Sequence, residues 1–67
     1  MTSDLDIYRT ANLLIDHHGE DAPIEAAMRA DAMLEAGDLE GYGMWRRIVR
    51  AVEELQRATP AGSGMAS

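Results

Sequence analysis

The chain has 67 residues, a formal net charge of −6 and no cysteine. This length allows one small domain, and the lack of cysteine excludes disulfides and thiolate metal sites. The N-terminus, MTSDLD, lacks the basic and apolar regions of a signal peptide, and no apolar run approaches the roughly 18 residues of a membrane span, so we expect a cytoplasmic protein with no membrane partner.

The first predicted helix spans residues 4–18. Ser3 suits its N-cap, and Asp6 completes a weaker form of the capping box. Apolar side chains recur at helical spacing, while Leu13 lies off their centre, so the apolar face is broad or the helix has a second contact surface. Gly19 suits the left-handed residue that ends a helix. The apolar face consists of Ile7, Ala11, Leu14, Ile15 and His18.

A second helix is predicted over residues 22–36. Asp21 suits its N-cap, and Pro23 fits a first helical turn because no intrahelical donor is required there. Gly37 is expected to stop this helix, and Asp38 to cap the next one. The helix is rich in alanine, which lets another helix approach closely but buries little apolar area.

The third predicted helix, over residues 39–58, holds most of the bulky aliphatic residues of the C-terminal half. Gly41 and Gly43 each cost about 1 kcal/mol relative to alanine, so we expect either a close backbone approach or a later helix start. Pro60 ends the helix, because the residue before a proline avoids the helical region, and residues 59–67 are predicted to form a disordered tail. The apolar stripe comprises Trp45, Ile48, Val49, Val52 and Leu55.

The links between the predicted helices are short, which favours antiparallel neighbours. We therefore expect an all-α domain over residues 1–58, either a three-helix bundle or three helices completed by a second chain. A core of this size is marginal. With no disulfide to stabilise it, the simplest remaining stabiliser is an identical partner, so we expect a homodimer or contact with another protein.

The charge of the chain is unevenly distributed. Residues 1–41 carry ten acidic and two basic side chains, for a net charge of −8, whereas residues 42–67 carry four arginines and two glutamates, for +2. The acidic total opposes nucleic-acid binding. A nucleic-acid-associated regulator is nevertheless an alternative, because the last two helices faintly resemble a helix-turn-helix with an anion-facing arginine stripe. The stripe contains Arg46, Arg50 and Arg57, with Arg47 further round and with Arg50–Glu54 and Glu53–Arg57 spaced as i, i+4 pairs.

His17 and His18 are weak candidate metal ligands, close to further carboxylates. Adjacent histidines point about 100° apart on a helix and lack the i, i+4 spacing that converges on a metal. We expect His18 to be a structural histidine on the apolar face. No metal or other cofactor is therefore predicted, and a metal-responsive module is the weaker alternative.

Trp45 is either the main core residue of the domain or part of an interface, and a homodimer would satisfy both interpretations. Tryptophan and tyrosine are enriched at binding hot spots. The chain has no cysteine nucleophile, no Ser/His/Asp arrangement and no phosphate-binding glycine loop, so we do not expect an enzyme. The candidate core or interface anchors are Tyr42, Trp45, Ile48, Val49 and Val52.

The landmarks of residues 7–56 are Ala11, Leu14, Ile15, His18, Gly19, Ala22, Ala26, Arg29, Ala30, Gly37, Asp38, Gly41, Trp45, Ile48, Ala51 and Leu55. As a set they resemble an uncharacterised family of short bacterial proteins of unknown function. The resemblance implies a small helical bacterial protein and carries across no catalytic residue. The leading hypothesis is therefore a small helical protein–protein interaction module that self-associates.

Overall fold

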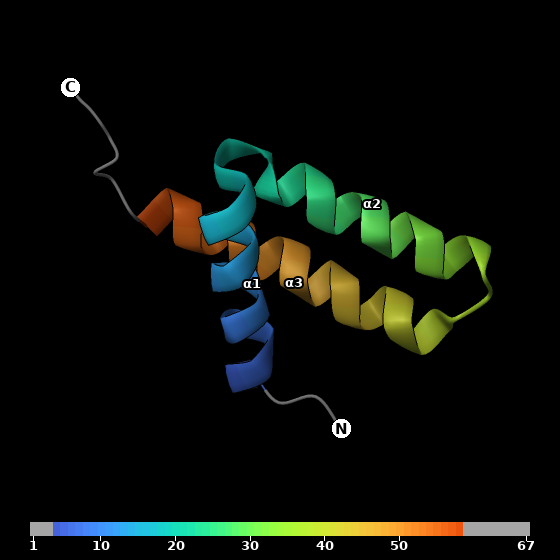
Figure 1. The fold of residues 1–67 in the computed structure, drawn as a ribbon. Coiled ribbons are helices and arrows are strands. Elements are labelled where there is room, and N and C mark those ends of the chain that lie inside the picture. The colour runs from blue at the N-terminus through green and yellow to red at the C-terminus, as the bar shows by residue number, and fades with distance from the viewer. Residues whose placement is uncertain (1–3, 59–67) are drawn as a thin grey trace.

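A computed structural model describes residues 4–58 and places all but three of them in helices (Figure 1). The described residues contain no β-strand, so the predicted all-α class is confirmed. Each helix begins and ends within one residue of its predicted bounds. The predicted N-cap Ser3 and the predicted tail, residues 59–67, lie outside the described residues. The elements are α1 (Asp4–His18), the 3-10 turn η1 (Gly19–Asp21), α2 (Ala22–Glu35) and α3 (Leu39–Ala58).

The helices are arranged as a hairpin with a third helix laid across it. In Figure 1, α2 and α3 lie side by side and antiparallel, and α1 crosses α3 steeply near the C-terminal half of α3. The structure is therefore not the simple bundle of aligned helices that the short links predict. The reason lies in η1, which leads from α1 into α2 through one tight turn, beginning at Gly19 with a φ of 56°.

The turn between α2 and α3 has the hydrogen bonds of a Schellman motif followed by a helix cap. Gly37, at a φ of 79°, donates its N–H to the Leu34 carbonyl at 3.0 Å, and the Asp38 N–H reaches the Met33 carbonyl at 2.9 Å. The Asp38 carboxylate then accepts the Gly41 N–H at 2.9 Å. The predicted stop at Gly37 and N-cap at Asp38 are both confirmed.

The core forms where α1 crosses the hairpin, and α3 contributes its bulkiest members. Ile48 and Val52 are the largest fully buried side chains. Ala22, Ala26 and Ala30 of α2 are buried too, which lets the helices approach closely. His18 departs from its prediction: it is exposed, because the apolar face of α1 ends before the chain turns at Gly19. The core cluster consists of Ile7, Ala11, Leu14, Ala22, Ala26, Ile48, Val49, Ala51 and Val52.

Polar contacts also join the first part of the chain to α3. The Tyr8 hydroxyl donates a hydrogen bond to the Glu54 carboxylate. The Gln56 side-chain amide donates to the Gly19 carbonyl at 2.8 Å, which satisfies a backbone acceptor at the end of α1. Together with the apolar contacts, these bonds fix α1 against the C-terminal half of α3.

Candidate functional site

The half of the hairpin that α1 does not cross, residues 31–47, is the first candidate surface, and we call it the hairpin tip. No residue in this segment is buried. Leu34 and Leu39 expose 48% and 68% of their surface, and the aromatic side chains of the tip are only half-buried. A groove of about 570 Å³ runs from the tip to α1, with Leu39 and Met44 on one side and Ile7 on the other. The tip therefore presents apolar surface that α1 does not cover.

Trp45 lies at the side of the hairpin, between core and solvent. The Arg29 guanidinium lies over its ring, 5.4 Å from the centroid, a distance at which a cation and an aromatic face attract each other. Arg29 also forms an ion pair with Glu25, at 3.3 Å. Trp45 is thus held in place by α2 while part of its ring stays accessible.

The predicted core or interface anchors divide into two groups. Ile48, Val49 and Val52 are buried in the core cluster. Tyr42 and Trp45 are half-buried and belong to the hairpin tip, and Trp45 also packs against the core cluster. The sequence places Leu34 on the apolar side of the second predicted helix and does not predict that Leu34 and Leu39 are exposed, since their exposure depends on how far α1 reaches along the hairpin.

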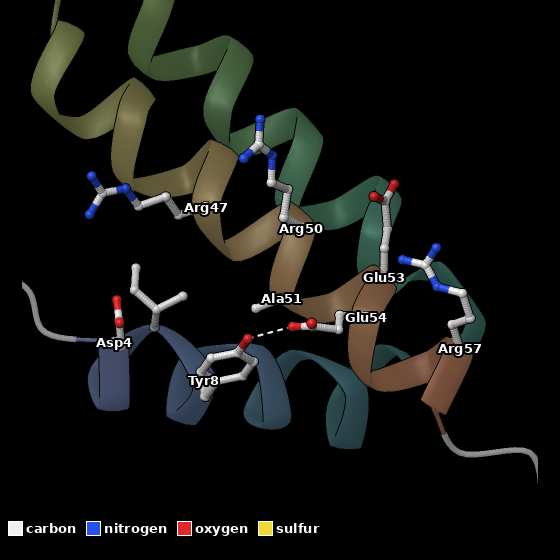
Figure 2. Close-up of a pocket in the computed structure, with 9 residues that line it drawn as sticks. Asp4, Tyr8, Arg47, Arg50, Ala51, Glu53, Glu54 and Arg57 are labelled. Carbon is white, nitrogen blue, oxygen red and sulfur yellow. Dashed lines mark hydrogen bonds between the residues drawn. The ribbon is translucent and has the colours of Figure 1, made fainter.

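A second candidate surface is an open groove of about 400 Å³ between α1 and α3, which we call the α1–α3 groove (Figure 2). Arg50 and Arg57 of the predicted arginine stripe line it, and Arg47 joins them, whereas Arg46 does not. The difference arises because α1 lies on the Arg47 side of α3. From α1, the lining residues are Asp4, Ile7 and Tyr8, and from α3 they also include Ala51, Glu53 and Glu54.

The predicted i, i+4 ion pairs of α3 are not among the ion pairs that residues 4–58 form. The Glu54 carboxylate instead accepts a hydrogen bond from the Tyr8 hydroxyl. Figure 2 shows the Arg50 side chain directed away from Glu54. The hydrogen bond to the Glu54 carboxylate, together with its negative charge, raises the pKa of Tyr8 above its ordinary value of 10.0. This link joins residues 46 positions apart, and no local sequence signal indicates it.

His17 and His18 are both exposed at the end of α1. Within residues 4–58, no three His, Asp or Glu side chains come together as a group that could hold a metal ion. In the same part of the chain, no helix has the length and apolar character needed to cross a membrane.

Comparisons of the chain with protein-family models, with curated proteins and with solved structures give no match. The function is therefore inferred from the two surfaces themselves: the apolar hairpin tip and the arginine-lined α1–α3 groove.

Proposed function

We propose that the protein is a helical protein–protein interaction module that self-associates through the hairpin tip. The observation that carries this proposal is the lack of any buried residue in the segment 31–47, which nevertheless holds Leu34, Leu39 and Trp45. An apolar helix face is stable when a further layer covers it. A second copy laid against the tip would supply there the layer that α1 supplies at the other end of the hairpin.

The apolar area at the tip suits a weak dimer. Complete burial of a leucine stabilises by about 1.5–3 kcal/mol. Covering the exposed parts of Leu34 and Leu39 in two copies would thus contribute about 3–7 kcal/mol. Association itself costs at least about 4 kcal/mol. The dimer must therefore also use the accessible parts of Tyr42 and Trp45, and it should dissociate on dilution.

The charge of the hairpin tip predicts how self-association should depend on salt concentration. Residues 31–47 carry four acids and two arginines, so two tips that meet repel each other. Salt screens such repulsion between exposed charges, with a Debye length of about 10 Å at 0.1 M. Self-association at the tip should accordingly strengthen as salt is added. The charged residues are Asp31, Glu35, Asp38, Glu40, Arg46 and Arg47.

The proposal is tested by measuring the mass of the chain by light scattering over a wide range of protein concentration, at low and at moderate salt. The expected result is a rise from monomer towards dimer with concentration, at lower concentration when salt is present. In the variant Leu39→Glu the mass should stay that of a monomer. Leu39 is the first residue of α3, where an acidic side chain is compatible with the helix dipole, so the variant should still fold.

Leu5→Glu is the matched control for this experiment. Leu5 lies in the first turn of α1 and is 67% exposed, against 68% for Leu39, so the two variants add the same charge at equally exposed leucines. Leu5→Glu should dimerise like the parent chain. A parent chain that stays monomeric at every concentration would contradict the proposal, as would equal loss of dimer in both variants.

The two alternative functions have less support. A nucleic-acid regulator needs a continuous basic surface, but Arg46 lies outside the groove that Arg50 and Arg57 line, and carboxylates lie among these arginines. A metal-responsive module would rest on His17 and His18, which have no converging third ligand among the described residues. The bacterial family and the cytoplasmic location stay predictions.

A further inference from the structure

We infer that the α1–α3 groove binds an acidic peptide segment of a partner protein, with carboxylates on Arg47, Arg50 and Arg57 and a small apolar side chain against Tyr8. The groove shares Arg47 with the hairpin tip, but Arg50 and Arg57 lie outside the tip, and the inference rests on different observations. An absence of peptide binding would therefore not contradict the proposed self-association.

The first observation is that the three arginines lack partners in the described part of the chain. All three are exposed, and the ion pair found on the i, i+4 pattern is Glu25–Arg29, on α2. A guanidinium presents its donors as a rigid fork that matches a carboxylate in two parallel hydrogen bonds. These arginines can therefore donate hydrogen bonds to carboxylates of another molecule without first breaking a bond within their own chain.

The second observation is the position of Tyr8. Its hydroxyl donates to Glu54, the glutamate spaced to pair with Arg50. Tyr8 thus holds Glu54 towards α1, and Figure 2 shows Arg50 pointing the other way. We assign Tyr8 as a positioning residue that keeps Arg50 available.

The third observation is the floor of the groove, where Ile7 and Ala51 lie between the charged residues. Both side chains belong to the core cluster and are at most 4% exposed, so they close the groove but offer little surface to a ligand. The accessible apolar surface is that of Tyr8, which lines the groove and is 38% exposed. A peptide can place a small apolar side chain against the Tyr8 ring and carboxylates on the arginines. A bare phosphate backbone has no equivalent of the apolar contact.

The spacing and density of charge favour a peptide over DNA. Duplex DNA carries one negative charge per about 1.7 Å, so some phosphates would meet Asp4 and Glu53, which also line the groove. Along a helix, Arg47 and Arg50 lie about 4.5 Å apart and Arg50 and Arg57 about 10.5 Å apart. An acidic helix can repeat that spacing and place neutral residues opposite the carboxylates of the groove.

The probe is a synthetic 14-residue peptide, acetylated and amidated, with glutamates at positions i, i+3 and i+10 and alanine, leucine and glutamine elsewhere. Two comparison ligands are used. One is the same peptide with glutamine in place of each glutamate, and the other is a 14-base-pair DNA duplex. Binding to the full chain is followed at about 50 mM salt by fluorescence anisotropy and by the NMR signals of the arginine Nε–H groups. The acidic peptide should bind saturably, weaken as salt rises, and shift the signals of Arg47, Arg50 and Arg57.

Arg50→Gln and Arg57→Gln should each weaken this binding about fivefold, as expected for the loss of about 1 kcal/mol in an exposed charge pair. Arg46→Gln is the matched control: it removes the same charge from the same helix, outside the groove, and should change the affinity less than twofold. Equal loss in Arg46→Gln, tighter binding of DNA than of the acidic peptide, or no saturable binding would each overturn the inference.

Tyr8→Phe tests the positioning role without changing the charge of the chain. Freed from Tyr8, Glu54 can pair with Arg50, so the affinity for the acidic peptide should fall about threefold while helicity by circular dichroism is retained. The double variant Tyr8→Phe with Glu54→Gln should recover the affinity, since no carboxylate then competes for Arg50. An unchanged affinity in Tyr8→Phe would overturn the role assigned to Tyr8.

Discussion

Gly41 and Gly43 lie two residues apart in the first turns of α3, in different surroundings. A Cβ on Gly41 would lie 2.6 Å from the Asp38 carboxylate and 2.9 Å from the Met33 sulfur, whereas a Cβ on Gly43 would have no atom within 4 Å. The close approach at Gly41 is therefore made by side chains and not by another backbone, and Gly43 has no close approach. Of the two reasons that the sequence left open, the later helix start is wrong, because α3 begins at Leu39.

We predict that Gly43→Ala stabilises the protein by about 1 kcal/mol, the difference in helix propensity. Gly41→Ala should bring no such gain, because its Cβ displaces the Asp38 cap, and a lost cap costs about 1 kcal/mol. Urea unfolding followed by circular dichroism measures both. A larger gain from Gly41→Ala than from Gly43→Ala would contradict this account of the two positions.

Trp45 and Ile48 differ in exposure, so their substitution by alanine should lower the stability of the protein by different amounts. Ile48 is 2% exposed, so Ile48→Ala should cost about 2–5 kcal/mol, the usual range for a buried aliphatic residue, and unfold much of a domain this small. Trp45 is half-buried beneath Arg29, so Trp45→Ala should cost less despite the larger side chain. The comparison is made by urea unfolding at a protein concentration low enough to keep both variants monomeric, and a greater cost for Trp45→Ala would place the indole in the core.

At the scale of the helices, the attachment of α1 to α3 should depend on pH at the alkaline end. The hydrogen bond to Glu54 raises the pKa of Tyr8, so the folded chain holds this proton more tightly than the unfolded chain does. The stabilisation is present below the ordinary tyrosine pKa of about 10 and is lost as pH rises through the raised value. We predict that Glu54→Gln lowers the pKa of Tyr8, measured by absorbance at 295 nm in a Tyr42→Phe background. An unchanged titration would show that the bond does not persist in solution.

The helix bounds and the turn between α2 and α3 were predictable because their signals are local, although Asp21 precedes α2 without a side-chain cap hydrogen bond. The Gly37 and Asp38 turn, for instance, depends on residues within a few positions of each other. The path of α1 was not predictable, since it depends on the geometry of η1 and on which small residues allow a close crossing. Consequently the sequence grouped Arg46 with the arginine stripe, whereas the position of α1 brings Arg47 into the groove instead.

At the scale of the whole molecule, the buried core lies at one end of the fold, and the hairpin tip at the other end has no buried residue. The described chain is elongated, with principal extents of 43 × 22 × 16 Å, and its buried residues gather where three helices meet. The hairpin tip is formed by α2 and α3, and α1 crosses the hairpin at its other end (Figure 1). This asymmetry is the physical basis for expecting a second copy at the tip.

The most direct test is an isotope-filtered nuclear Overhauser experiment on a mixture of labelled and unlabelled chain at a concentration that favours the dimer. It detects only contacts between different molecules. The account predicts intermolecular contacts at Leu34, Leu39 and the Trp45 ring, and none at Leu5. Contacts confined to α1, or a chain of proven dimeric mass with no contact at the tip, would contradict it.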